Sequence, residues 1–229
     1  MLKVLIVSAS PRPYGACRSV AKLLLELSKQ YENVEAEHID VYDYTILPCV
    51  GCVSDNVKAC RFPCPIDDDV PKLYEKVERS DIMIFVSPIY WYNVPGQLKN
   101  FIDRLTIFEN AIFVEGRSRL EGKVVGFIAI GNDVGAIALI QNLMITFNSM
   151  GTAVPPWALA YHASEEDALE NEKFLLDAAN VLHCAILMAR AIREGKPVSE
   201  WYRADPEFRK FVIELARKIR EDVDRELHR

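Results

Sequence analysis

The stretch DIMIFVSPIYWYNVPG, residues 81–96, decides the fold class. Its first part, Asp81–Ser87, is a short apolar run rich in β-branched residues, which is typical of a buried strand. Pro95 stands where the first turn of a helix accepts a proline, and apolar residues then recur at helical spacing as far as Leu105. A buried strand followed directly by a helix is the repeating unit of parallel α/β proteins.

The same alternation continues on both sides of this stretch. Four further strands are predicted, at Lys3–Ser8, Val34–Ile39, Val124–Ile130 and Thr152–Ala160. Helical patterns follow the strands, with apolar faces within residues 20–27, 70–79, 140–147 and 175–189. The last helix is expected to begin at Ser164, because Ser164 and Asp167 resemble a capping box. Pro155 and Pro156 predict an irregular or edge position for the fifth strand, since proline donates no ladder hydrogen bond. We therefore predict a five-stranded parallel sheet covered by helices on both faces.

The chain is expected to divide into a main domain, residues 1–195, and a C-terminal helical extension, residues 196–229. A cysteine-rich segment, residues 49–64, is inserted in the main domain. Asp205 followed by Pro206 predicts the start of a helix in the extension. Its apolar stripe has two interpretations, packing on its own domain or contact with another subunit.

Composition excludes several classes of function. The 229 residues carry a formal net charge of −6, so no excess of Lys and Arg indicates nucleic-acid binding. No uninterrupted apolar run has the length of a membrane span, and Val181–Ile192 is broken by His183 and Arg190. The apolar start of the chain is too short for a signal peptide. We expect a cytoplasmic protein that binds neither nucleic acid nor membrane.

The loop after the first predicted strand favours an anion. It combines hydroxyls, a flexible glycine and arginines with the start of a helix, whose free N–H groups attract a phosphate. The loop matches neither dinucleotide nor triphosphate motifs, so a single phosphate fits it better. A serine-rich loop without a ligand is the alternative. The candidate residues are Ser10, Arg12, Gly15, Cys17, Arg18 and Ser19.

The loops after the third and fourth strands favour a planar ligand. Three adjacent aromatic residues between prolines suit a flat heteroaromatic ring, although they would also suit a core cap or a subunit contact. Glycines in the next loop let backbone approach a ligand, although turn formation alone explains them equally well. The candidates are Pro88, Ile89, Tyr90, Trp91, Tyr92, Asn93, Gly131 and Asn132.

Three motifs, Ser10-Pro11-Arg12, Asp67-Asp68 and the run Ser87–Arg104, resemble the NADPH-dependent FMN reductase family, and within it the iron–sulfur flavoproteins. The resemblance covers about residues 1–190. It implies a flavodoxin-like three-layer sandwich with strand order 2-1-3-4-5, FMN at the switch point, NAD(P)H as co-substrate, and a homodimer or homotetramer.

By this resemblance, specific residues would contact FMN. Ser10 and Arg12 would hold the phosphate, helped by Ser19 or Cys17. Residues 88–93 would line the isoalloxazine, and Gly131 with Asn132 would close its other side. The family often has Asn-Thr-Ser where this chain has Ala16-Cys17-Arg18, so we hypothesise that Arg18 compensates with charge. Lys99, Asp103 and Arg104 belong to the family motif and are interpreted as surface ion pairing or subunit contact.

Four of the six cysteines, Cys49, Cys52, Cys60 and Cys64, supply the thiolates needed by a [4Fe–4S] cluster or by structural zinc. Disulfides or free thiols are further alternatives. Iron–sulfur flavoproteins carry a compact cysteine motif at this place, but position 55 is Asp here and Cys60 would have to serve. The remaining Cys17 and Cys184 are expected to pack in the core. His38 is expected on a strand surface, and His162 in a solvated loop.

The function predicted is an FMN-dependent oxidoreductase. Electrons would pass from NAD(P)H or a reduced carrier through FMN, with or without a [4Fe–4S] cluster, to an acceptor such as ferredoxin. The flavin carries the chemistry, so no catalytic side chain is predicted. The alternative is a non-catalytic FMN-binding electron carrier or docking module with structural zinc or no metal.

Overall fold

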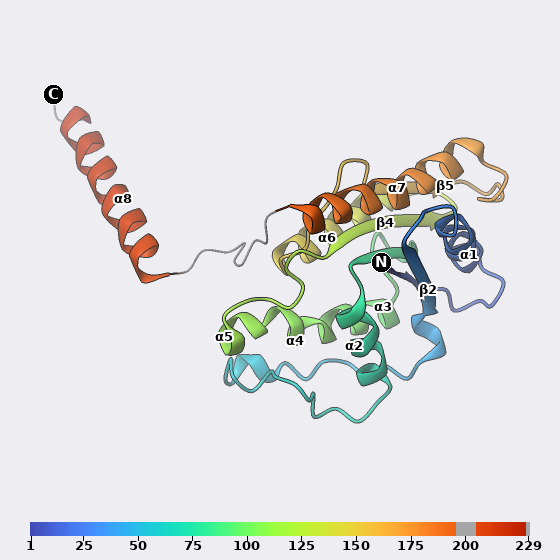
Figure 1. Ribbon diagram of the computed structural model, residues 1–229, viewed down its shortest axis with the longest axis horizontal. Helices are drawn as coiled ribbons and strands as arrows, with labels where there is room; N and C mark the ends of the chain where they lie inside the picture. Colours follow the sequence, from blue (N-terminus) through green and yellow to red (C-terminus); the bar gives the residue numbers. More distant parts are fainter. Residues whose placement is uncertain (196–204, 228–229) are drawn as a thin grey trace. The chain divides into compact units, whose positions relative to one another are not determined.

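The computed structural model describes residues 1–195 and 205–227 (Figure 1). The chain divides into two compact units, Met1–Pro197 and Val198–Arg229, which are described separately. The part of the predicted extension at residues 196–204 and 228–229 lies outside the described residues.

The first unit is built on a five-stranded sheet with the order β2-β1-β3-β4-β5, and every pairing is parallel. The predicted strand order is therefore confirmed. The strands are β1 (Leu2–Ser8), β2 (Val34–Asp40), β3 (Ile82–Pro88), β4 (Val124–Gly131) and β5 (Leu159–Ala163).

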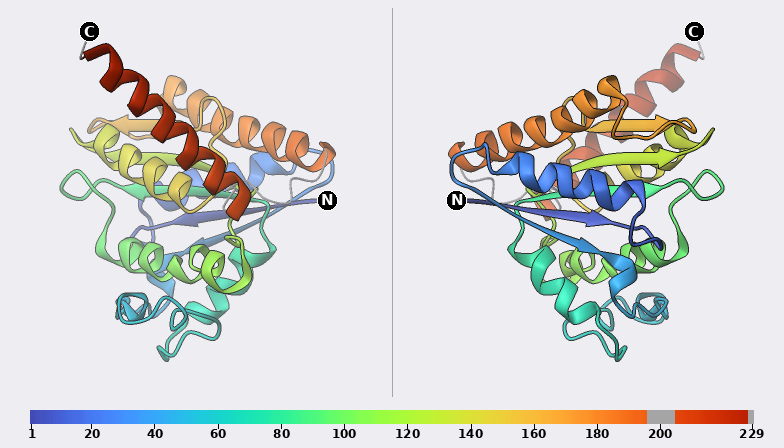
Figure 2. Two further views of the ribbon diagram at one scale, coloured as in Figure 1. Left: turned by 90° about the vertical axis from the view of Figure 1, so that its left-hand side faces the viewer. Right: turned by 90° about the vertical axis from the view of Figure 1, so that its right-hand side faces the viewer.

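Helices cover both faces of the sheet, as predicted. Figure 2 shows α1 (Ala16–Ser28) and α7 (Glu172–Glu194) on one side, and α2 (Val70–Arg79) and α3 (Gly96–Arg104) on the other. The second side also includes α6 (Ala136–Ser149) and the short helix α4 (Thr106–Glu109). The short helix α5 (Ala111–Glu115) follows α4 in the chain.

Successive side chains of a strand point to opposite faces, so each strand supplies both cores. In β1, Ile6 packs with α1 and α7, whereas Leu5 and Val7 pack with α2, α3 and α6. Two separate hydrophobic cores hold the helices against the sheet. The strand ends are thereby fixed with the precision of a packed interior.

The fifth strand differs from its predicted range. It begins at Leu159, after Pro155 and Pro156, and ends at Ala163. Upstream of the prolines only an isolated bridge joins Ala153 to Val124. Prolines lack the N–H donor, so the ladder cannot run continuously through them. The predicted edge position is confirmed.

The last helix of the main unit also differs from its predicted start. It begins at Glu172, where Asn171 Oδ1 accepts a hydrogen bond from Phe174 N at 2.9 Å. Ser164 and Asp167 instead stabilise local turns, because each accepts a hydrogen bond from an amide two residues ahead. A short polar side chain can cap a turn as well as a helix, and the sequence alone does not separate the two.

Among the described helices, α7 alone is long and apolar enough to cross a membrane by length and composition. Its buried residues, which include Val181, Leu182 and Ile186, pack into the core beneath the sheet. A core helix of a globular domain has this composition too.

The second unit contains α8 (Pro206–Leu227). The helix begins as predicted, with Asp205 Oδ1 accepting a hydrogen bond from Phe208 N at 2.8 Å. Phe211, Val212, Leu215 and Ile219 of its apolar stripe are exposed. Contact of this stripe with another subunit stays a prediction.

Candidate functional site

The loops after β1, β3 and β4 lie at one edge of the sheet. Parallel strands end at the same edge, and Ser8 at the end of β1 pairs with Asp40 of β2 and with Val86 of β3. The next two strands in the sequence, β2 and β3, lie on opposite sides of β1, so the strand order reverses there. Ligands of open α/β sheets bind at such a switch point.

The loop after β1 folds tightly around Gly15. Ser10 is buried, and its hydroxyl donates to Arg12 O at 3.0 Å, while Gly15 N donates to the same oxygen at 3.0 Å. A Cβ at Gly15 would lie 2.2 Å from Ser10 Oγ, so only glycine fits as the loop stands. Next, α1 begins at Ala16. Arg18 N and Ser19 N donate to Gly15 O at 3.0 and 3.2 Å, whereas the amides of Ala16 and Cys17 precede the first bond of the helix. The loop is therefore compact and leads directly into a helix N-terminus, the kind of position where anions bind in many proteins.

Asp40 holds this loop in place. Its buried carboxylate accepts hydrogen bonds from Ser8 Oγ and from Ser10 N, the latter at 3.0 Å. His38, one pleat earlier on β2, lies 2.8 Å from Ser8 Oγ and is half-buried rather than on the surface. Sequence reasoning missed Asp40 because the second strand was expected to end at Ile39. One signal could have identified Asp40. Neighbouring parallel strands end at the same edge of the sheet, so a polar residue at the end of the second strand lies beside Ser8 at the end of the first.

The other candidates of this loop lie in different environments. Arg12 is exposed, and Ser19 is half-buried in the first turn of α1. Cys17 is buried in the core, and burial, with Asp40 nearby, raises the pKa of its thiol to about 12. The Cys17 side chain is therefore a protonated packing group, and only its backbone N–H faces the loop end of the helix.

Arg18 is already paired. Its guanidinium contacts Asp40 Oδ2 at 3.2 Å and Asp43 Oδ1 at 2.8 Å. The hydrogen bond to Asp43 raises its pKa. Arg18 thereby links α1 to the 3₁₀ turn Val41–Asp43. Because two carboxylates already offset its charge, a phosphate would have to compete with them for Arg18.

The loop after β3 contains a strained aromatic turn. Tyr90 and Asn93 exchange backbone hydrogen bonds of 2.8 and 3.0 Å around Trp91 and Tyr92, which have φ values of 50° and 65°. Two central residues with positive φ define a type I′ turn, which normally takes Asn and Gly. Trp91 is 94% exposed and Tyr92 55% exposed. Such strain in bulky, exposed residues points to a function outside the fold.

The loop after β4 packs against this turn. A Cβ at Gly131 would lie 2.8 Å from Ile89 Cδ1, and one at Gly135 would lie 3.1 Å from Tyr92 Cα. The two loops therefore form one surface, and Asn132 is exposed on it. Pro88 ends β3 beside this surface.

Three polar side chains of α3 hold the segment between β2 and α2. They recur at i, i+3 and i+7, and so lie on one face of the helix. Each donates to a backbone carbonyl: Gln97 to Tyr44 O at 2.9 Å, Asn100 to Ile46 O at 3.3 Å, and Arg104 to Leu47 O at 3.2 Å. Helix α3 thus joins the aromatic turn at its start to the cysteine segment at its end, a length of about 13 Å at ~1.5 Å per residue.

The four clustered cysteines lie close together on that segment. Cys60 is buried, and burial together with the thiols of Cys52, Cys49 and Cys64 raises its pKa to about 12. In the structure as described, all six cysteines are free thiols. Figure 1 shows the segment running beside α2, α4 and α5, and Asn110 fixes it there by donating to Cys60 O at 2.8 Å.

The thiols fit a metal centre in number and chemistry. Within residues 1–195 and 205–227, however, no group of three or more His, Cys, Asp or Glu side chains is placed to hold a metal ion. The sulfurs would therefore have to turn toward a common centre on binding. Coupling of this kind between metal binding and local folding is usual.

Two expectations about charged and polar residues are wrong. Arg104 is fully buried rather than on the helix surface, and it pairs with Asp68 at 2.6 Å. His162 is buried in β5, with Nε2 2.9 Å from Glu166 O, rather than solvated. Lys99 and Asp103 do form an exposed ion pair along α3, as predicted.

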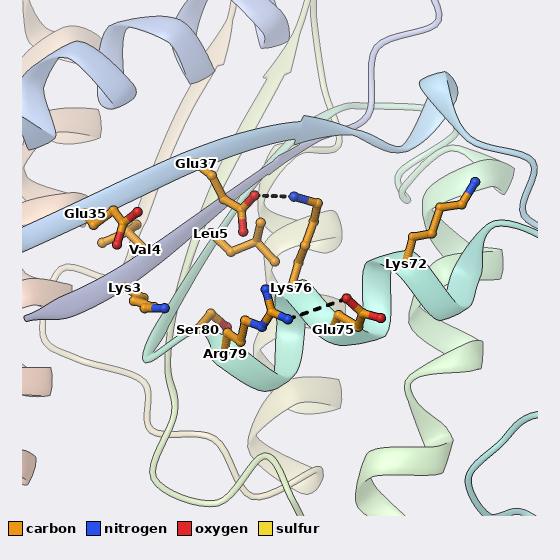
Figure 3. Close-up of a pocket in the computed structure, with 10 residues that line it drawn as sticks. All are labelled: Lys3, Val4, Leu5, Glu35, Glu37, Lys72, Glu75, Lys76, Arg79 and Ser80. Atoms are coloured by element: carbon orange, nitrogen blue, oxygen red, sulfur yellow. Dashed lines mark hydrogen bonds and ion pairs between the residues drawn. The ribbon is translucent and has the colours of Figure 1, made fainter.

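A cavity of about 400 Å³ lies elsewhere, between α2 and the beginnings of β1 and β2 (Figure 3). Four of its seven charged side chains pair with one another, Lys76 with Glu37 and Arg79 with Glu75. It shares no residue with the loops after β1, β3 and β4. We therefore place the candidate cofactor site at the loops and not in this cavity.

The fold and these loops define a class: a flavodoxin-like α/β protein with a compact loop at a helix N-terminus and an exposed aromatic turn at the same edge of the sheet. Residues 2–166 match the family of NADPH-dependent FMN reductases. The chain belongs to this family.

Individual relatives agree with the class. An iron–sulfur flavoprotein of Methanocaldococcus jannaschii is 33% identical over 130 residues, which is 57% of this chain and 62% of that protein. The chain thus matches less than two thirds of that relative's length. A Bacillus subtilis protein named as an NAD(P)H-dependent FMN-containing oxidoreductase is 27% identical over 79% of this chain and 97% of its own. A crystal structure of RosB with a bound riboflavin-phosphate intermediate shares the fold, with TM-score 0.74 and 21% identity over 97% of this chain and 88% of that one.

Proposed function

We propose that this protein is an oxidoreductase that binds FMN at the loops after β1, β3 and β4 and is reduced by NAD(P)H. The observation that carries the proposal is the meeting of a glycine-dependent anion loop with a strained, exposed aromatic turn at the switch point of the sheet. Family membership agrees with it.

The residues divide into two roles. Ser10 and the amides at the start of α1 would hold the FMN phosphate, because N–H and O–H groups there can donate to its oxygens. Residues 89–93 would place the ring against the β4 loop, where Asn132 offers polar atoms. Bound FMN supplies hydride acceptance and release of electrons singly or in pairs. The protein orients the ring and limits its access to water.

We further propose that Cys49, Cys52, Cys60 and Cys64 ligate a [4Fe–4S] cluster. Proximity of the four thiols supports this assignment, as do relatives that are named iron–sulfur flavoproteins. The cluster would relay single electrons from the flavin toward a protein acceptor such as ferredoxin. The link through α3 keeps the two centres about one short helix apart.

Anaerobic absorption spectroscopy tests the flavin part. The purified protein is loaded with FMN, freed of excess, and mixed with NADPH or NADH. The visible absorption band of the flavin should bleach after the nucleotide is added. Protein without flavin should show no such change. Failure to retain FMN would reject the proposal. Retention without bleaching by either nucleotide would instead identify the electron carrier that the sequence left as the alternative.

Iron, zinc and acid-labile sulfide assays test the cysteine part. The wild type reconstituted with Fe(II) and sulfide should hold about four irons per chain. The Cys60→Ser variant should lose this iron and keep FMN. Cys184→Ser is the matched control, because Cys184 lies on α7 outside the segment. Zinc in place of iron, or equal iron in both variants, would contradict the cluster assignment.

A further inference from the structure

A groove lined mostly by apolar side chains lies along α7, beside β5. Its volume is about 440 Å³, and it shares no residue with the loops after β1, β3 and β4. The α7 residues that line it recur at helical spacing, so they lie on one face of the helix. The lining residues are Trp157 and Leu159 from the β5 side, and Asp177, Asn180, His183, Cys184 and Leu187 from α7.

Apolar surface around this groove is exposed in a single chain. Leu187 is 49% exposed, and Trp157 is 77% exposed. Of the most apolar 18 residues of α7, only 33% are buried in the described structure. Apolar surface that continues from one element to the next is typical of an interaction site.

Trp157 is held at the edge of the groove in an unfavourable backbone conformation. Its φ of 51° lies in the left-handed region, which bulky residues rarely adopt. The next residue is anchored to the sheet, because Ala158 O accepts a hydrogen bond from Phe127 N at 2.8 Å. The fold thus exposes the indole at a cost in backbone strain, which is typical of functional surfaces.

The polar groups of the groove are largely satisfied within the chain. Asn180 Nδ2 donates to Leu176 O at 2.9 Å, and His183 Nδ1 lies 3.1 Å from Tyr31 Oη. An apolar cover would leave these bonds in place and so cost little desolvation. Asp177 differs, because it forms no ion pair among the described residues. Its carboxylate favours a partner with positive charge.

Helix α8 has the properties that this groove requires. Its exposed apolar stripe runs from Phe211 to Ile219, a length of about 12 Å at ~1.5 Å per residue. The groove residues of α7 run from Asp177 to Leu187, about 15 Å on the same scale. An amphipathic helix that lays its apolar face into a groove of similar length is a common mode of recognition.

Charge favours the same occupant. Residues 1–195 contain 25 Asp and Glu against 18 Lys and Arg, whereas residues 206–220 contain two against five. Arg209 lies one turn before Val212 and is exposed at the border of the stripe. Opposite charges of this kind orient an association.

The stripe and the groove are both exposed in one chain, so the cover of each comes from another molecule. A second copy supplies both in equal number. We propose that the apolar stripe of α8 packs into the α7–β5 groove of a second copy, and that the exchange is mutual. Mutual exchange closes a two-fold dimer. The contact requires neither flavin nor metal.

A cysteine cross-link tests the contact. Leu215 lies near the middle of the stripe and Cys184 near the middle of the groove, so the pair meets whichever way α8 runs. The Leu215→Cys variant is treated with a short bis-maleimide at low protein concentration, and peptide mass spectrometry identifies the linked positions. A link between positions 184 and 215 in a product of dimer mass is expected. The matched control, Leu215→Cys with Cys184→Ser, should lose it.

Light scattering over a series of concentrations measures the assembly itself. The wild type should be at least a dimer. Leu187→Glu and Leu215→Glu should each weaken association at least about 10-fold, because each places a charge in the apolar contact. Ile213→Glu is the matched control, since Ile213 is similarly exposed but lies on a different face of α8.

Four results would overturn the inference. A monomeric wild type would do so, as would association that resists both glutamate substitutions. A link between positions 184 and 215 in a product of monomer mass would show that α8 packs on its own chain. A dimer linked through position 215 in the Cys184→Ser control would show instead that the α8 helices of two copies pair with each other.

Discussion

Replacement of Gly15 by alanine tests the anion loop directly. The backbone of Gly15 is extended, with φ −71° and ψ 149°, so alanine is sterically allowed there as far as the backbone is concerned. The obstacle is the Ser10 hydroxyl, 2.2 Å from the new Cβ. Ser10 must rotate, and it then loses its hydrogen bond to Arg12 O.

The expected magnitude follows from the bonds that are lost. Ser10 has a single hydroxyl proton. Arg12 O accepts it in the free protein, in a bond of about 1 kcal/mol, and the phosphate would accept it in the complex. A charge-assisted bond from Ser10 to the FMN phosphate would contribute about 1.5–3 kcal/mol. At about 1.4 kcal/mol per tenfold change, FMN should bind roughly 10- to 150-fold more weakly.

Quenching of flavin fluorescence measures the binding, with riboflavin as the ligand that lacks the phosphate. Riboflavin affinity should change little, because only the phosphate contact is perturbed. Gly96→Ala is the matched control, since Gly96 also opens a helix and an added Cβ meets nothing within 4 Å. Equal weakening of FMN and riboflavin, or no weakening of either, would refute the placement of the phosphate.

Three further predictions concern strain, charge and pH. Trp91→Asn with Tyr92→Gly should raise stability by about 1–3 kcal/mol in urea unfolding, by relieving positive φ, while FMN binding weakens. Arg104→Met should cost about 3–5 kcal/mol, because Asp68 is left charged and buried. Adding Asp68→Asn should recover part of this loss in the same assay, because it removes the charge and keeps an oxygen that can accept from Leu47 N or Val70 N. Burial lowers the pKa of His38 below 6.5, so the folded state resists the proton that the unfolded state takes up. Stability should therefore fall as pH drops below 6.5, and His38→Gln should flatten this part of the pH profile of the urea midpoint.

The sequence predicted most of the sheet because its strands are short apolar runs bounded by helices of clear period. The fifth strand and the last helix were misplaced for local reasons. The fifth strand begins only at Leu159, because Pro155 and Pro156 interrupt the predicted range. The hydroxyl of Ser164 caps a turn instead of a helix. Signals that serve turns and helices alike cannot fix a boundary.

The candidate site was predicted in part. Its loops follow from the rule that ligands lie at the carboxyl ends of parallel strands, but the partners of its residues do not. Asp40 contacts Ser10 across 30 positions of sequence, and Arg104 contacts Cys64 across 40. Nothing in the local pattern predicts the burial of Arg104, since a charged residue at a helix end is ordinarily exposed.

The sequence by itself determined the alternation of strands and helices, the glycine-containing loop after β1, the aromatic turn and the four clustered cysteines, because each is a local pattern. Only the tertiary structure decided which polar groups meet: Asp40 with the loop after β1, α3 with the cysteine segment, and Arg104 with Asp68 and Cys64. These contacts are fixed by the packing of the two hydrophobic cores. That packing depends on all of the helices and strands together, so no local stretch of sequence specifies it.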